Sequence, residues 1–267
     1  MLYKLTVTVV GLLFLSNCVN KKNPTESKIF RNLEAISTGI DFQNILVEND
    51  SMNYFNYTSI YSGAGVSTGD INNDGLIDVF LTGNQVQNKL FLNKGNLQFE
   101  NITIKAGVGG DARWYTGTTM ADINGDGYLD IYCSVAGIAN EKRNQLYLNN
   151  GDGTFIEVGE KYGIDDSANS IQGTFFDYDN DGDLDLYIAN YPISDVNTSN
   201  FTYLNRIKTV SNQESDKLFR NDGNVFTNVS EVSGLKSYGF SFGVVASDVN
   251  NDGWQDLYVS NDYSIPD

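Results

Sequence analysis

The sequence predicts an all-β protein, a β-propeller built of four-stranded antiparallel blades with calcium-binding loops. An acidic nine-residue pattern, D-x-[ND]-x-D-G-x-x-D, begins at residues 70, 122, 177 and 248, and a short apolar run follows each copy. Clusters of Asn, Asp and Gly recur after the first three copies, between further apolar runs. Such clusters are typical of hairpin turns, so each unit is predicted to contain several short strands.

The acidic pattern places hard oxygen ligands at alternating positions, with a glycine for a sharp turn, as Ca²⁺ requires. We expect side-chain ligands at loop positions one, three, five and nine, and a backbone carbonyl at position seven. The predicted ligands, for about four ions in all, are Asp70, Asn72, Asp74, Asp78, Asp122, Asn124, Asp126, Asp130, Asp177, Asp179, Asp181, Asp185, Asp248, Asn250, Asp252 and Asp256. An ordinary turn would explain one such loop, but four loops that share the ninth acid favour a metal site.

The acidic loops differ from an EF-hand, which needs a bidentate Glu at position twelve and a helix on each side. Position twelve is occupied by Leu81, Cys133, Ile188 and Val259. None of these side chains can bind Ca²⁺. The residues after each loop are β-branched and aromatic, which is typical of strands. The loops are therefore expected to connect two strands.

The remaining strands of each unit follow in a fixed order. Third strands are predicted at residues 89–93, 145–149 and 217–221, and fourth strands at residues 99–102, 155–158 and 226–229. A short element such as Ala106-Gly107-Val108 closes each unit. One such sheet cannot bury both of its faces, so the sheets are expected to stack radially as propeller blades.

The two ends of the repeat region suggest an incomplete ring of about four blades over residues 30–267. Residues 30–40 match the end of a unit, a fourth strand followed by the short closing element, and we expect this strand to complete the last blade. The sequence stops at Asp267, soon after the second strand of the fourth unit. The chain is therefore interpreted as a truncated product or as the N-terminal part of a longer protein.

The N-terminus is predicted to be a lipoprotein signal peptide over residues 1–17. Lys4 precedes an apolar stretch at residues 5–16, which is too short to span a bilayer. The stretch ends in Leu15-Ser16-Asn17-Cys18, which resembles a bacterial lipobox, although Asn17 replaces the commoner Gly, Ala or Ser. Cys18 is then the lipidation site, and residues 18–29 form a flexible tether; an ordinary secretory signal is the alternative. We expect a lipid-anchored protein at the outer membrane or cell surface.

Composition excludes several classes of function. The net charge is −17, from 17 basic and 34 acidic residues, and this argues against nucleic-acid binding. The chain has no histidine, which removes Ser-His-Asp catalysis and His-ligated zinc. No nucleophile–base pair or phosphate loop is evident, so the chain is not expected to be an enzyme. Cys133 lies in a strand run and is expected to be a buried apolar residue.

The segments that vary most between units are expected at the end of the blades opposite the acidic loops. They contain aromatic and Arg side chains of the kind that dominate binding hot spots. The predicted partner-binding residues are Arg113, Trp114, Tyr115, Tyr191, Phe201, Tyr203, Arg206 and Tyr238. Packing between blades is the alternative for Trp114 and Tyr115. The insertion at residues 191–213 is the strongest candidate, because long insertions are often functional.

The acidic loops and the L-[FY]-x-N-x-G element resemble FG-GAP and VCBS repeats over residues 30–267. Residues 65–84 and Ser260-Asn261-Asp262 more narrowly resemble ASPIC/UnbV (CRTAC-type) proteins, which include bacterial outer-membrane lipoproteins. The resemblance implies propeller blades and Ca²⁺ ligands at the matching positions of all four loops. The ASPIC domain that usually follows the propeller is not in this sequence, so its function is not implied.

We expect a cell-surface binding or adhesion module for a glycan or protein partner. Two alternatives remain open. Propellers of other families host enzymes, so the chain could be a hydrolase or lyase that acts on polysaccharide, or it could be a scaffold subunit of an outer-membrane uptake complex.

Overall fold

The computed structural model describes residues 30–111, 113–138, 142–208, 214–235 and 240–262. The repeats lie in one compact unit that begins at Ala35, and residues 30–34 belong to a separate unit. The predicted signal peptide, Cys18 and the tether lie outside the described residues. Within the described ranges, no helix is long and apolar enough to cross a membrane.

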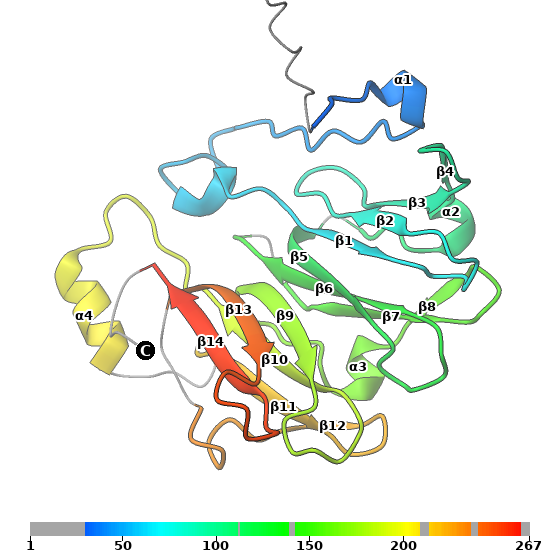
Figure 1. The fold of residues 1–267 in the computed structure, drawn as a ribbon. Helices are drawn as coiled ribbons and strands as arrows, with labels where there is room; N and C mark the ends of the chain where they lie inside the picture. Colours follow the sequence, from blue (N-terminus) through cyan, green and yellow to red (C-terminus); the bar gives the residue numbers. More distant parts are fainter. Residues whose placement is uncertain (1–29, 112, 139–141, 209–213, 236–239, 263–267) are drawn as a thin grey trace, which may run out of the picture. The chain divides into compact units, whose positions relative to one another are not determined.

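The described strands form four antiparallel sheets that follow one another along the chain (Figure 1). The first three sheets are β1 (Val66–Gly69), β2 (Asp78–Leu81), β3 (Lys89–Asn93) and β4 (Phe99–Asn101); β5 (Trp114–Ala121), β6 (Asp130–Ala136), β7 (Gln145–Asn149) and β8 (Phe155–Glu157); and β9 (Ser170–Phe176), β10 (Asp185–Asn190), β11 (Lys217–Asn221) and β12 (Phe226–Asn228). The fourth sheet pairs β13 (Ser241–Ser247) with β14 (Asp256–Asn261). The short helices are α1 (Ala35–Thr38), η1 (Thr58–Tyr61), α2 (Thr103–Ala106), α3 (Gly159–Tyr162) and α4 (Asn200–Lys208).

The spatial order of strands in each sheet is the chain order, as in the blades of a β-propeller. This confirms the predicted all-β fold and its four-stranded units. The third strands begin and end at the predicted residues, and each fourth strand is one residue shorter than predicted. We refer to the sheets as blades one to four in chain order.

Successive blades stack through alternating faces of their strands. In β6, Ile131 and Cys133 pack in the cluster shared with blade one. Tyr132 points the other way, into the cluster shared with blade three. In β10, Tyr187 faces blade four in the same manner. Strand side chains alternate between faces, so each middle blade buries an apolar layer on both sides.

The prediction of a strand within residues 30–40 is wrong. The structure places α1 there, and the helix ends at Thr38, before Gly39, whose φ is +83°. Gly107 after α2 and Gly163 after α3 have the same left-handed conformation. An added Cβ would meet the carbonyl oxygen of Phe99 at Gly39, of Phe155 at Gly107 and of Phe226 at Gly163. Residues 35–39 therefore form the same closing element as in the other units, as predicted, but no strand precedes them at residues 30–34.

Blade four leaves one face uncovered in the described part of the chain. Tyr258 occupies the strand position of Tyr132 and Tyr187, two residues after the ninth loop acid. Tyr132 and Tyr187 are buried against the next blade, whereas Tyr258 is 69 % exposed. This difference follows from stacking, because blades two and three each have a described neighbour on this side.

Candidate metal centre

The four acidic loops connect the first and second strands of the blades, as predicted. We name them loop one (residues 70–78), loop two (122–130), loop three (177–185) and loop four (248–256). Figure 1 shows these loops at one end of the strands, while α4 lies toward the other end. The β3–β4 turn lies on the loop side, because Lys94 lines the same small cavity as Asn72.

The first aspartate of each loop is held by backbone N–H groups of the turn. In loop one, Asp74 N donates to Asp70 Oδ1 at 3.1 Å and Gly75 N donates to Asp70 Oδ2 at 2.7 Å. The same pair of bonds recurs in the other three loops. Gly75 has a φ of +85°, and the equivalent glycines lie between +89° and +98°. Only glycine adopts this conformation readily, which explains its place in the pattern.

The ninth aspartate joins its loop to the neighbouring strand. Asp78 is fully buried; its Oδ2 accepts from Ile71 N at 3.0 Å and its Oδ1 from Asn93 N at 2.7 Å. Asp130 and Asp185 make the equivalent bonds in loops two and three. This aspartate therefore fixes the second strand, the third strand and the loop in one arrangement.

The asparagine that ends each third strand supports the loop from behind. Asn93 Nδ2 donates to Ile77 O at 2.8 Å, and Asn149 Nδ2 donates to Leu129 O at 3.1 Å. Asn149 Nδ2 also lies 2.8 Å from Ile71 O, in the loop of the preceding blade. The sequence showed this asparagine only as part of a repeated element, and its supporting role depends on strand pairing.

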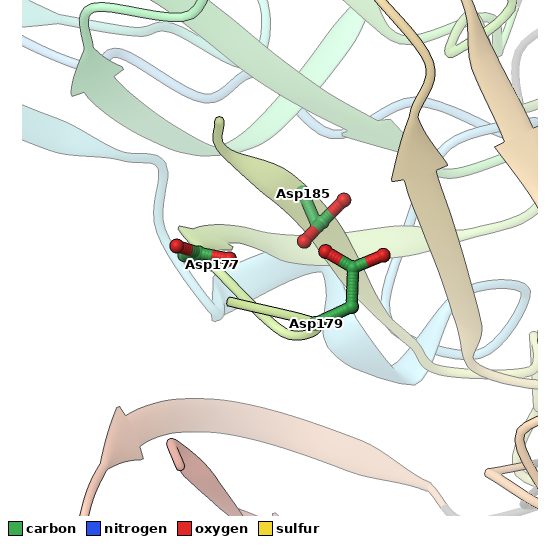
Figure 2. A group of neighbouring side chains, drawn as sticks. All are labelled: Asp177, Asp179 and Asp185. Carbon is green, nitrogen blue, oxygen red and sulfur yellow. The ribbon is translucent and has the colours of Figure 1, made fainter. Parts of the chain in front are cut away.

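Loop three carries the densest group of carboxylates. Asp177, Asp179 and Asp185 each offer an oxygen within 4.8 Å of the others, and Figure 2 shows their side chains around one space. They form the one group of three such side chains found in the described residues. In loops one, two and four an Asn occupies position three. Its amide donates to the aspartate at position five, as from Asn72 to Asp74 at 3.0 Å. Loop three has no such amide.

Burial places these carboxylates in an unfavourable environment for negative charge. It raises the pKa of Asp130 and of Asp185 to about 6, against the opposing effect of backbone hydrogen bonds. Burial, followed by neighbouring aspartates, also raises the pKa values of Asp179 and Asp183. One buried oxygen of each, Asp179 Oδ1 and Asp183 Oδ1, has no hydrogen-bond partner. Buried oxygens without donors are a feature that a bound cation would explain.

Two pairs of neighbouring loops are joined by hydrogen bonds. Asn73 Nδ2, at position four of loop one, donates to Gly127 O of loop two at 2.9 Å. Asn180 Nδ2, at position four of loop three, donates to Gly253 O of loop four at 3.1 Å. Position four of loop two is Gly125, which has no side chain to reach loop three. Loops one and two, and loops three and four, are therefore linked in pairs.

The structure corrects the exposure expected for several partner-binding residues. Trp114, Tyr115 and Tyr191 are buried. Trp114 packs edge-on against Tyr57, and the Tyr115 hydroxyl donates to Gln145 Oε1 at 2.6 Å. Tyr191 packs edge-on against Phe240 with ring centroids 5.1 Å apart. Tyr115 packs in the cluster between blades one and two, as the alternative interpretation held, whereas Trp114 packs with Tyr57 and Ile60 of the segment before blade one.

The other predicted partner residues differ in their environments. Arg113 forms an ion pair with Asp111 at 3.0 Å and donates to Arg143 O at 2.6 Å. Phe201 is 71 % exposed on α4, and Tyr203 packs against Phe240. The side chain of Arg206 and the whole of Tyr238 lie outside the described part of the structure.

The family profile of the FG-GAP-like repeat matches residues 55–133, 135–188 and 207–259. The chain belongs to the FG-GAP repeat family. Among its relatives, cartilage acidic protein 1 from Mus musculus is 26 % identical over 208 residues, and that from Xenopus tropicalis is 28 % identical over 206 residues. Each alignment covers 76 % of this chain but 29 % of the relative. The FG-GAP chain therefore spans less than a third of the length of these relatives.

Proposed function

We propose that this FG-GAP chain is an exported, calcium-stabilised binding module without catalytic activity. The observation that carries the metal assignment is loop three, with its group of three carboxylates and two buried oxygens that lack donors. Family membership supports it, because the resemblance already implies calcium at the matching loop positions.

The residues of the loops fit Ca²⁺ by their chemistry. Every predicted side-chain ligand is an Asp or Asn oxygen, and Ca²⁺ prefers such hard ligands to nitrogen or sulfur. The ion would be held by positions one, three, five and nine, and it would neutralise carboxylates whose pKa values burial raises. Metal would then stabilise the junction between the loop and the second and third strands, because the ninth aspartate bonds to both.

Thermal unfolding of the full-length protein in detergent, with EGTA or with a Ca²⁺ titration, tests this assignment. Calcium at a hundred times its dissociation constant should stabilise the fold by about 2.7 kcal/mol for each site that binds only the native state. Asp177→Asn should lower both the number of bound ions and the gain in melting temperature, because position one is an aspartate in all four loops. Glu100→Gln is the matched control, since Glu100 is an exposed carboxylate on β4, outside the loops. Equal melting temperatures in EGTA and Ca²⁺ would contradict the assignment.

The absence of histidine supports a non-catalytic role, because the usual general base is lacking. Cys133 is fully buried, and burial raises the pKa of its thiol to about 12, so the reactive thiolate is not formed at neutral pH. The dense acidic groups described above belong to the metal loops. Incubation with polysaccharides and measurement of released reducing ends tests this; turnover by the pure protein would contradict it.

Export and lipid anchoring rest on residues 1–18 of the sequence alone. An apolar stretch ending at Cys18 supports cleavage and lipidation of a bacterial lipoprotein. Expression in a bacterial host with radiolabelled palmitate tests the assignment. The wild type should be labelled and the Cys18→Ser variant should not, whereas equal labelling would contradict lipidation at this residue.

A further inference from the structure

A groove of about 500 Å³ lies at the end of the blades opposite the metal loops. We call it the tyrosine groove. Three separate segments line it: residues 54–62, residues 191–203 of the insertion, and the paired strands β13 and β14, through Phe242 and through Asp262 just after β14. Ligand sites usually have volumes of this order and form where several segments converge. None of the metal loops contributes to it.

The lining of the groove combines aromatic faces with hydrogen-bonding groups. Tyr54, Tyr191, Tyr203 and Phe242 provide rings, and the remaining described lining consists of Ser, Thr, Asn and Asp residues and Val196. No Lys or Arg lies among these lining residues, and Asp195 and Asp262 carry negative charge. Anionic ligands would be repelled, since nothing in the lining would balance their charge.

A second cavity of about 280 Å³ continues the groove toward the inner strands. It shares Ser59, Ser62 and Phe242 with the tyrosine groove and extends to Trp114 and Gln172. Phe242 is 41 % exposed and stands at the junction of the two spaces. Beside the groove, Tyr54 and Tyr61 stack with their ring planes 18° apart, and both rings are exposed. The site is therefore elongated and has aromatic rings along its length.

Several contacts hold the groove in shape without a ligand. Tyr191 packs between Phe240 and Phe242, and its hydroxyl donates to Asp262 Oδ2 at 3.1 Å. Thr58 N donates to Ser194 O at 3.4 Å, and the two side-chain hydroxyls lie 3.1 Å apart. These bonds connect the two long segments that form the walls. A preformed site loses less entropy on binding than a flexible one.

We propose that the tyrosine groove binds a neutral oligosaccharide. Sugar hydroxyls are donors that can bond to carboxylates and to Ser, Thr and Asn side chains. The apolar faces of sugar rings can pack on Tyr54 and Phe242, and the second cavity provides room for further units. This assignment gives the ligand class of the proposed binding module, but it does not depend on the metal sites.

Calorimetric titration of the full-length protein with a panel of hexasaccharides tests the proposal. The neutral probes are cellohexaose, xylohexaose, mannohexaose and maltohexaose, and the acidic probe is hexagalacturonate. At least one neutral probe should bind, and hexagalacturonate should not. Phe242→Ala and Tyr54→Ala should each weaken that binding about tenfold, as expected for an aromatic hot spot. Phe201→Ala is the matched control, because Phe201 is exposed nearby but does not line the groove; it should leave affinity unchanged.

Melting temperatures of all variants, measured in saturating Ca²⁺, separate lost binding from lost folding. Failure of every neutral probe to bind to folded protein would overturn the groove assignment, as would equal affinity in Phe242→Ala and wild type. Binding of hexagalacturonate, or of a lysine-rich peptide instead of any sugar, would also overturn it. Calcium binding without sugar binding would refute the groove alone, and sugar binding without a response to Ca²⁺ would refute the metal assignment alone.

Discussion

The hydrogen bond between loops three and four should couple their metal affinities. Asn180→Gly removes the amide that donates to Gly253 O while keeping the left-handed backbone, since Asn180 has a φ of +57° and glycine adopts this conformation without strain. An ion bound in loop three would fix Asn180, and Asn180 would then order the peptide between Gly253 and Trp254 through this bond. Loop four consequently has less entropy to lose when it binds its own ion.

The expected magnitude follows from the exposure of this bond. One hydrogen bond contributes about 0.5–1.5 kcal/mol, and the exposed position of Asn180 places the coupling at the lower end, about 0.5–1 kcal/mol. This corresponds to a two- to fivefold weaker Ca²⁺ affinity at loop four, by the rule that about 1.4 kcal/mol is tenfold. Coupling is reciprocal, so loop three should weaken by the same factor.

Tryptophan fluorescence provides the assay. The chain has two tryptophans; Trp254 is at position seven of loop four and half exposed, whereas Trp114 is buried away from the loops. The Ca²⁺ concentration at the midpoint of the change in Trp254 fluorescence should rise two- to fivefold in Asn180→Gly. Asn96→Gly makes the same change at a φ of +53° in an exposed turn outside the loops, and it should have no effect.

The reverse substitution extends the test. Gly125→Asn should create the missing link from loop two to loop three, because Gly125 has a φ of +71° and open space where a side chain would begin. Equal Trp254 midpoints in Asn180→Gly and Asn96→Gly would refute the coupling.

Three further predictions concern stability and reactivity. Tyr132→Ala should lower the free energy of unfolding by about 3–5 kcal/mol in denaturant titrations, because Tyr132 is buried between blades. Tyr258→Ala, at the equivalent exposed position, should change it by less than about 0.5 kcal/mol. Similar losses in the two variants would contradict the stacking. Gly182→Ala should weaken Ca²⁺ binding at loop three, because a φ of +98° strains any other residue by about 1–2 kcal/mol. Calorimetric titration measures the affinity, and an unchanged value would show that binding does not need this turn conformation. Cys133 should resist a thiol-reactive dye at pH 8 until the protein unfolds, since burial raises its pKa to about 12; rapid labelling of native protein would contradict its burial.

Periodic features of the sequence predicted most of the fold. The acidic loops, the third strands and the hairpin turns repeat the same local chemistry in each unit, so turn and strand preferences agree at every copy. The strand expected before the closing element is absent from residues 30–34, whereas the closing element itself was matched correctly to that of the other units. Its conformation depends on the close contact of Gly39 with Phe99, which no local preference specifies.

The acidic loops were predicted more completely than the tyrosine groove, because local sequence determines the loops but not the groove. The predicted metal ligands of each loop lie within nine residues of one another, so their spacing alone brings them together. Burial of Trp114 depends on Tyr57, far away in the sequence. One wall of the tyrosine groove was predicted, because the insertion at residues 191–213, with Tyr191 and Tyr203, was the strongest partner-binding candidate. The opposite wall at residues 54–62 was not predicted, because it lies far from the insertion in the sequence.

The bond between Thr58 and Ser194 has a consequence for the order of folding. Each blade contacts mainly its neighbours, so blades can form one after another as the chain emerges. Thr58 and Ser194 are 136 residues apart, and closing so long a loop is slow compared with pairing adjacent strands. The contact between the groove wall at residues 54–62 and the inserted segment at residues 191–213 should therefore form only after blade three has folded. Binding to the proposed site should therefore begin only after the intervening blades have assembled.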